Sequence, residues 1–138
     1  MSIGRVLIAG AAAGLLGALA SALITGRLFH RFQALTPQTW RAGEGPKQYA
    51  LASGLTLLCA LLVATLFNAA GWAFSVSESW CLNAALFGVL CWAALVAPVL
   101  LSMALFANVN RYFVLGLLLD WLVVATLASV AMAWALRF

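Results

Sequence analysis

The chain carries very little charge. Of its 138 residues, 7% are charged and 67% are hydrophobic, whereas soluble domains are about 25% charged. So few polar side chains cannot cover the surface of a water-soluble globule, which excludes that class of protein. The chain must use lipid as part of its solvent. Its length leaves room for four spans of about 20 apolar residues each, joined by short connections.

The residue types that build metal and cofactor sites are also scarce. The chain has one histidine, His30, and three cysteines, Cys59, Cys81 and Cys91, with no CxxC pair and no Cys/His cluster. We therefore predict no metal site and no cofactor, and interpret the cysteines as small apolar side chains. The net charge of +4 comes from basic residues beside apolar spans. Such residues set topology and contact lipid headgroups, so we predict no nucleic-acid partner.

Four long apolar stretches predict an all-α fold, a polytopic transmembrane four-helix bundle forming one domain over residues 1–138. The stretches are apolar on all sides, as expected for helices surrounded by lipid and by one another. They are too long, and too free of alternation, for a β-barrel. The charge after the first stretch exceeds the charge before it, which favours a retained helix over a cleaved signal peptide. The predicted spans are about 6–26, 49–72, 80–106 and 113–136, with a loop at 27–48.

Basic residues predict the orientation of the bundle. Arg5 and Arg137 fall on one side of the predicted membrane. The positive-inside rule places the richer side, with the 27–48 loop, in the cytoplasm and both termini outside. Each basic residue near an anionic leaflet contributes about 1 kcal/mol to binding. The richer side carries five residues that we predict to contact lipid headgroups: Arg27, Arg31, Arg41, Lys47 and Arg111.

The first span contains two rows of small residues at four-residue spacing. Residues four apart lie on one face of a helix, and small side chains there let another backbone approach closely, which drives helix association in lipid. The rows predict that this span is enclosed on more than one side, by helices of this chain or of another copy. The first row is Gly10, Gly14, Ala18, Ala22 and Gly26, and the second is Ala13, Gly17, Ser21 and Thr25.

Asp120 is a carboxylate inside an otherwise apolar stretch of the fourth span. A charged side chain in hydrocarbon costs at least a few kcal/mol, so such residues face the bundle interior and find a partner, or stay protonated. Counting to the same depth in every span predicts a polar pocket around this carboxylate. Its predicted members are Ser21, Thr25, Ser53, Thr56 and Ser102, with Trp92 and Trp121 as walls and Arg27 or Arg111 reaching toward it.

Three roles for Asp120 remain open. It locks the bundle, or locks it to another subunit. It is the proton or cation site of a small transporter, since a carboxylate in low dielectric can exchange a proton near neutral pH. It is an acid or base in an enzyme acting on a lipid-phase substrate, which needs a second chemical group. No Ser-His-Asp, phosphate-binding or metal-ligand spacing supports the enzyme, so we favour a non-enzymatic protein.

Two further residue patterns predict local structure. Pro98 has no backbone N–H and leaves the carbonyl of Ala94 without its helical partner, which predicts a distortion of the third span. Asn68 and Asn83 lie at similar depth in neighbouring spans. We predict a hydrogen bond between them, contributing about 0.6 kcal/mol.

The second half of the chain resembles an uncharacterised family of small bacterial four-helix integral membrane proteins, known as a domain of unknown function. Leu16-Gly17-Ala18-Leu19 is similar to the opening helix of that family. The resemblance implies a multi-pass protein of the bacterial inner membrane and no particular activity. The expected partners are membrane lipids, copies of the same chain in a homo-oligomer, or other subunits of a larger membrane complex. The remaining matching residues are Trp92, Ala97-Pro98-Val99-Leu100-Leu101, Ala104-Leu105-Phe106, Arg111, Phe113 and Trp121-Leu122.

Overall fold

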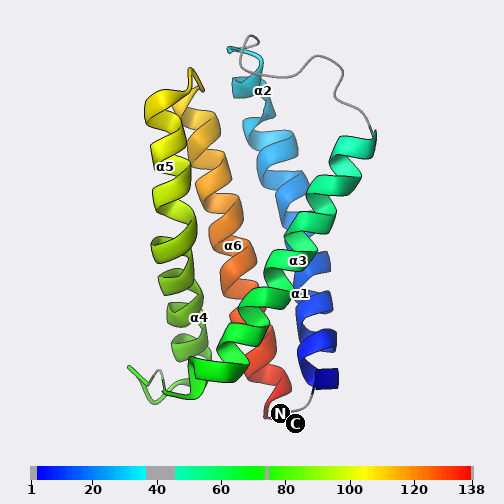
Figure 1. Ribbon diagram of the computed structural model, residues 1–138, viewed down its shortest axis with the longest axis vertical. Helices are drawn as coiled ribbons and strands as arrows, with labels where there is room; N and C mark the ends of the chain where they lie inside the picture. Colours follow the sequence, from blue (N-terminus) through cyan, green and yellow to red (C-terminus); the bar gives the residue numbers. More distant parts are fainter. Residues whose placement is uncertain (1–2, 37–45, 74, 138) are drawn as a thin grey trace.

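The predicted all-α membrane bundle is confirmed by the structure, a computed structural model that describes residues 3–36, 46–73 and 75–137. Within these ranges four helices are long and apolar enough to cross a membrane. The start of the first span, the end of the last and the connection between the second and third lie at one end of the bundle (Figure 1). The end of the first span, the start of the second and the connection between the third and fourth lie at the opposite end, which we call the α2 end.

The first span is longer than its sequence predicted. It consists of α1 (Ile3–Leu23), a π-helical turn η1 (Ile24–Phe29) and α2 (His30–Gln33). The helix passes the predicted end at residue 26 because two aromatic side chains beyond it pack against the fourth span. Phe29 covers Gly116, and the ring of Phe32 lies 5.1 Å from that of Tyr112.

The other spans agree with the prediction to within three residues at each end. They are α3 (Pro46–Ala70), followed by the 3-10 turn η3 (Gly71–Ala73), then α4 (Trp80–Cys91), the π-helical turn η4 (Trp92–Val96) and α5 (Ala97–Phe106), and finally α6 (Arg111–Ala135). Side chains cap two of these helices. The Ser79 hydroxyl accepts a bond from the Leu82 N–H, and the Asn110 side-chain oxygen accepts one from the Tyr112 N–H. Such caps satisfy backbone donors that have no partner within the helix.

The distortion predicted from Pro98 takes the form of the η4 turn. The N–H of Ala97 donates to the carbonyl of Trp92, five residues earlier. Proline removes one donor, and its ring crowds the carbonyl four residues before it. Widening the preceding turn accommodates that ring, and single π-helical turns of this kind are frequent at functional sites.

The last span, α6, is the centre of the bundle. It packs against α1, α3 and α4, and in Figure 1 it lies between the α4–α5 span and α1. In the most apolar 18-residue stretch of α6, 44% of the residues are buried, against 17% in that of the α4–α5 span. Although α3 and α4 are consecutive in the chain, they contact each other much less than either contacts α6.

The first row of small residues in α1 faces α3. A Cβ atom added at Gly10 would lie 3.0 Å from the Cα of Leu61, and one at Gly14 would lie 2.9 Å from the Cα of Leu57. These distances are possible only because both residues are glycine. The row does not stay in contact along its whole length. Ala22 and Gly26 are exposed, because α3 diverges from α1 toward the α2 end (Figure 1).

The second row of small residues in α1 faces α6. Ala13 is completely buried in a cluster with Val124 and Ala128, and a Cβ atom at Gly17 would lie 3.1 Å from Val124. The two rows therefore serve two different neighbours, both from the same chain. The prediction that the first span is enclosed on more than one side is confirmed.

The predicted bond between Asn68 and Asn83 is wrong. The Asn83 side-chain oxygen accepts bonds from the backbone N–H groups of Val76 and Ser77, and its amide donates to the Ser77 carbonyl at 2.7 Å. The backbone groups in the connection before α4 lie closer to the Asn83 amide than Asn68 does, and they need hydrogen-bond partners. The Asn83 amide therefore bonds to them and not to Asn68. The side-chain nitrogen of Asn68 is buried and makes no hydrogen bond to the described residues.

Candidate functional site

Asp120 is buried at the contact between α6 and α1, with 5% of its surface exposed. The hydroxyl of Ser21 lies 2.6 and 2.5 Å from the two carboxylate oxygens and donates to them. The hydroxyl of Thr25 donates to one of these oxygens at 3.1 Å. The predicted contact of Asp120 with Ser21 and Thr25 is therefore present in the structure.

Helical spacing explains why these groups meet. Ser21 and Thr25 continue the α1 row that begins at Ala13, so they face α6. One turn from Asp120 toward the α2 end, the ring of Phe29 covers Gly116, where a Cβ atom would lie 2.5 Å from that ring. One turn the other way, Gly17 packs on Val124. The carboxylate and its two hydroxyls are thus enclosed between apolar layers.

The π-helical turn η1 begins within the part of the first span that supplies the two hydroxyls. It starts at Ile24, between Ser21 and Thr25, and ends at Phe29. A π-helical turn holds one more residue than an α-helical turn, and therefore rotates the residues after it relative to those before it. The sequence gives no signal for this turn, because no proline follows it.

Three hydroxyls that were predicted to join the cluster do not. Thr56 is buried, but its hydroxyl donates to the Ala52 carbonyl of its own helix at 3.1 Å, and its methyl group lies toward Gly17. Ser53 and Ser102 are exposed on the outside of the bundle. These residues were chosen by depth, and depth does not determine which side of a helix faces the centre.

The predicted walls and cation also lie elsewhere. The indole N–H of Trp92 donates to the Leu118 carbonyl of α6 at 2.9 Å, and Trp121 packs beside the core residues around Val63 and Val124. Both tryptophans line a cavity between α3 and α4. Arg27 and Arg111 are exposed, and the Arg111 guanidinium lies 5.2 Å over the ring of Tyr112.

The chemistry of the cluster follows from its oxygen atoms. Among the described residues no basic side chain pairs with Asp120, so only hydroxyl groups support the carboxylate. Two carboxylate oxygens and two hydroxyls can hold a proton or a small cation. The part of the chain that the structure describes contains no group of three His, Cys, Asp or Glu side chains able to bind a metal ion. His30 is exposed at the α2 end and supplies no second acid or base.

Basic residues gather at the α2 end, as the sequence indicates. Arg27, Arg31, Lys47 and Arg111 are all exposed there, and Arg41 lies outside the described residues. The Arg31 guanidinium lies 4.9 Å over the ring of Phe32. Contact of these residues with lipid headgroups stays a prediction.

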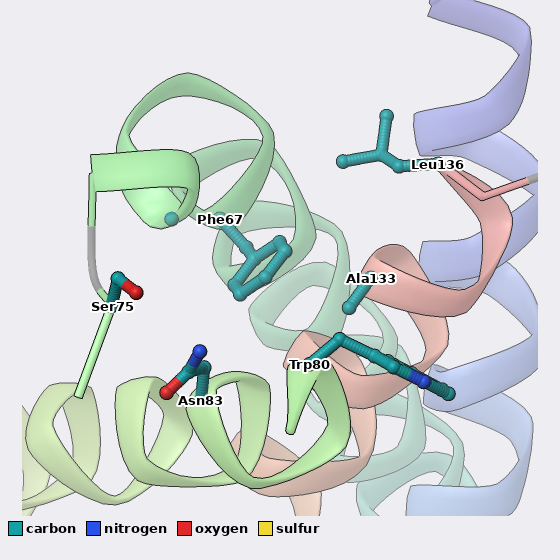
Figure 2. A pocket seen from close by; sticks show the side chains of 7 residues that line it. Phe67, Ser75, Trp80, Asn83, Ala133 and Leu136 are labelled. Atoms are coloured by element: carbon teal, nitrogen blue, oxygen red, sulfur yellow. The ribbon is translucent and has the colours of Figure 1, made fainter. Parts of the chain in front are cut away.

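A small pocket lies at the opposite end of the bundle, with a volume of about 230 Å³. Figure 2 shows Phe67, Trp80, Ala133 and Leu136 around it, with Ser75 and Asn83 on the side of the α3–α4 connection. Asn83 already bonds to the backbone of that connection. The pocket is therefore the incompletely filled end of the apolar core.

Comparisons with known proteins leave the resemblance to a small bacterial membrane family as a prediction. No family model matches the chain, and neither a curated protein nor a solved structure matches it.

Proposed function

We propose that this integral membrane protein has no enzymatic activity and acts by assembling laterally in the membrane, either with copies of itself or as a subunit of a larger complex. The surface for this assembly is the small-residue face formed by α1 and α3 near the α2 end. The observation that carries the proposal is that this face contains glycines and a hydroxyl that no helix among the described residues covers.

Two groups of helical glycines differ in what surrounds them. Gly10, Gly14, Gly17, Gly88 and Gly116 pack so closely on other helices that an added Cβ atom would lie within 3.1 Å of a neighbour. Nothing lies within 4 Å of that position at Gly26 or Gly54. Glycine inside a helix costs roughly 0.5–1 kcal/mol relative to alanine. A close approach of another helix offsets that cost at the first group, and a second protein molecule would offset it at the other two.

Polarity and spacing support the same surface. Ser53 precedes Gly54 and is exposed, and its hydroxyl makes no hydrogen bond within the described residues. Ala50 and Ala22, each four residues before one of the open glycines, are exposed as well. Small residues four apart and accompanying hydroxyls are the features through which membrane helices associate.

A bilayer association assay tests this proposal. Donor- and acceptor-labelled copies of the full chain are reconstituted at increasing lipid-to-protein ratio, and energy transfer reports association. We expect Gly54→Leu to weaken association at least about tenfold, which is about 1.4 kcal/mol. Val99→Phe, which adds bulk to an exposed position on α5, should leave it unchanged. Wild-type protein that is monomeric and purifies without another protein would contradict the proposal.

A second function is favoured by the Asp120 cluster, because a buried carboxylate whose partners among the described residues are hydroxyls suits reversible binding of a proton or cation. In this alternative the chain is a small proton- or cation-coupled transporter with Asp120 as the titrating site. Proton flux into liposomes containing wild-type protein should exceed that with Asp120→Asn, which keeps the size of the side chain. Equal flux through both, with both folded, would exclude this function.

We also propose an orientation in the bacterial inner membrane, with the α2 end in the cytoplasm and both termini in the periplasm. The exposed basic residues at the α2 end support it. A reporter enzyme that is active only outside the cytoplasm should be active when it is fused to either terminus. The reverse pattern would show that the orientation is wrong.

A further inference from the structure

A cavity of about 370 Å³ separates the middle of α3 from the middle of the α4–α5 span, over α6. We call it the α3–α4 groove. It exists because α3 and α4 both pack on α6 and have little contact with each other. The residues that line it on α3 are Cys59, Leu62, Val63, Thr65 and Leu66, and the others are Cys91, Trp92, Leu95, Val96, Trp121 and Ala125.

The groove offers a ligand almost no polar contact. The indole N–H of Trp92 already donates to the Leu118 carbonyl, and the Thr65 hydroxyl donates to the Leu61 carbonyl at 2.8 Å. The remaining lining side chains are aliphatic, aromatic or thiol groups, and the indole N–H of Trp121 is the one further donor among them. A polar ligand would lose its bonds to water without replacement, at a cost of several kcal/mol. The occupant is therefore hydrocarbon.

The groove is closed toward the α3–α4 connection. There the rings of Phe67 and Phe87 meet edge to face, with their centroids 5.3 Å apart, and complete the apolar core. The lining on α3 extends from Cys59 to Leu66, which at 1.5 Å per residue is about 10 Å. A hydrocarbon chain therefore enters from the α2 end, and the Phe67–Phe87 pair closes the far end of the groove.

The α2 end indicates which hydrocarbon chain this is. Lys47 lies twelve residues before Cys59 on α3, a distance of about 18 Å along the helix axis. One leaflet of hydrocarbon is about 15 Å thick, half of the bilayer core. A lipid whose headgroup lies beside the exposed Lys47, Arg27, Arg31 and Arg111 would place the end of its chain in the groove. The positive charge of these residues complements an anionic headgroup.

We propose that the α3–α4 groove binds one acyl chain of an anionic phospholipid from the leaflet at the α2 end. The acyl chain fills the space between α3 and α4, which make little contact with each other. This inference concerns a different surface from the α1–α3 face of the proposed assembly, and it holds whether or not the protein associates with other copies.

Bromine on an acyl chain quenches a tryptophan that it contacts, and Trp92 and Trp121 both line the groove. The full chain is placed in phosphatidylcholine nanodiscs containing small amounts of phosphatidylglycerol brominated near the end of one acyl chain. We expect wild-type quenching to reach half its maximum at about a tenfold lower bromolipid fraction than random mixing gives. Cys59→Phe fills the groove and should abolish this preference. Leu58→Phe, on the exposed side of the same helix, should retain it.

Three results would overturn the proposal. The first is quenching at the random-mixing level in wild-type protein. The second is an unchanged preference in Cys59→Phe and in a second groove-filling variant, Thr65→Phe, provided that circular dichroism shows both folded. The third concerns which lipid supplies the acyl chain. The proposal is overturned if brominated phosphatidylcholine shows an equal preference. It is also overturned if an isoprenoid alcohol displaces the bromolipid and unbrominated phosphatidylglycerol does not.

Discussion

Removing the Ser21 hydroxyl should destabilise the bundle through its loss of contact with Asp120. The structure sets the size of the effect. Ser21 lies within hydrogen-bond distance of both carboxylate oxygens, at 2.6 and 2.5 Å, and Asp120 is 5% exposed. Hydrogen bonds to charged groups contribute about 1.5–3 kcal/mol in soluble proteins. Interhelical bonds in membranes average about 0.6 kcal/mol and reach about 1.7 kcal/mol.

The Ser21–Asp120 pair belongs at the upper end of the membrane range, because it is short and buried. We expect a coupling energy of about 1.5 kcal/mol from a double-mutant cycle of Ser21→Ala and Asp120→Ala. Thr25 approaches only one oxygen, at 3.1 Å, so the matched Thr25→Ala cycle should give about 0.5 kcal/mol.

Unfolding of the protein in mixed micelles by sodium dodecyl sulfate, followed by tryptophan fluorescence, gives the free energy of unfolding for each variant. A Ser21–Asp120 coupling below about 0.3 kcal/mol would refute the reasoning, because additive changes of that size mean that the two residues do not interact. A larger coupling for Thr25 than for Ser21 would refute the geometry of the cluster.

Four other substitutions have defined outcomes. Gly88→Ala should lower the free energy of unfolding in the same assay by about 1–3 kcal/mol, because the new Cβ atom would lie 2.7 Å from α6 backbone atoms. Gly10→Ala should cost less, since its nearest neighbour is the flexible end of Leu61, and an equal cost would contradict this. Asn83→Ala removes three hydrogen bonds from the connection before α4, so limited proteolysis there should accelerate. Trp92→Phe removes the bond to α6 and should lower the free energy of unfolding by about 1 kcal/mol. An unchanged free energy of unfolding would show that this bond does not stabilise the bundle.

Much of the fold could be predicted because lipid imposes strong rules on a sequence. Length and apolar composition predicted four spans, and the spacing from Gly10 to Thr25 predicted that α1 has two covered faces. Ser21 and Thr25 were predicted to join Asp120 from their depth alone, and they reach it because they also belong to the row of α1 that faces α6.

The errors in the Asp120 cluster share one physical cause. Equal depth in the membrane was used to add Ser53 and Ser102 to the cluster, but depth gives only the position along a helix. The rotation of each helix about its axis depends on which neighbours it contacts, and α3 and α5 turn these hydroxyls outward. The assignment of Asn83 failed because a nearby connection competed for its amide.

No pattern in the sequence predicts the close packing of Gly88. It is a single glycine, outside any row, and its role is visible only where α4 approaches the backbone of α6 at Ala125 and Thr126. A contact between one residue and another helix's backbone leaves no periodic pattern. The η1 turn escaped prediction for a similar reason, since the contact of Phe29 with Gly116 depends on the whole bundle.

The central position of α6 has a consequence for how the chain assembles. Spans enter the membrane in chain order, and α6 is the last of the four described. Until it arrives, α1 and α3 can pair through Gly10 and Gly14, but α4 has almost nothing to bind, and the hydroxyls of Ser21 and Thr25 face lipid. Insertion of α6 therefore closes three contacts at once, and the carboxylate of Asp120 enters a membrane in which its two hydroxyl partners are already in place.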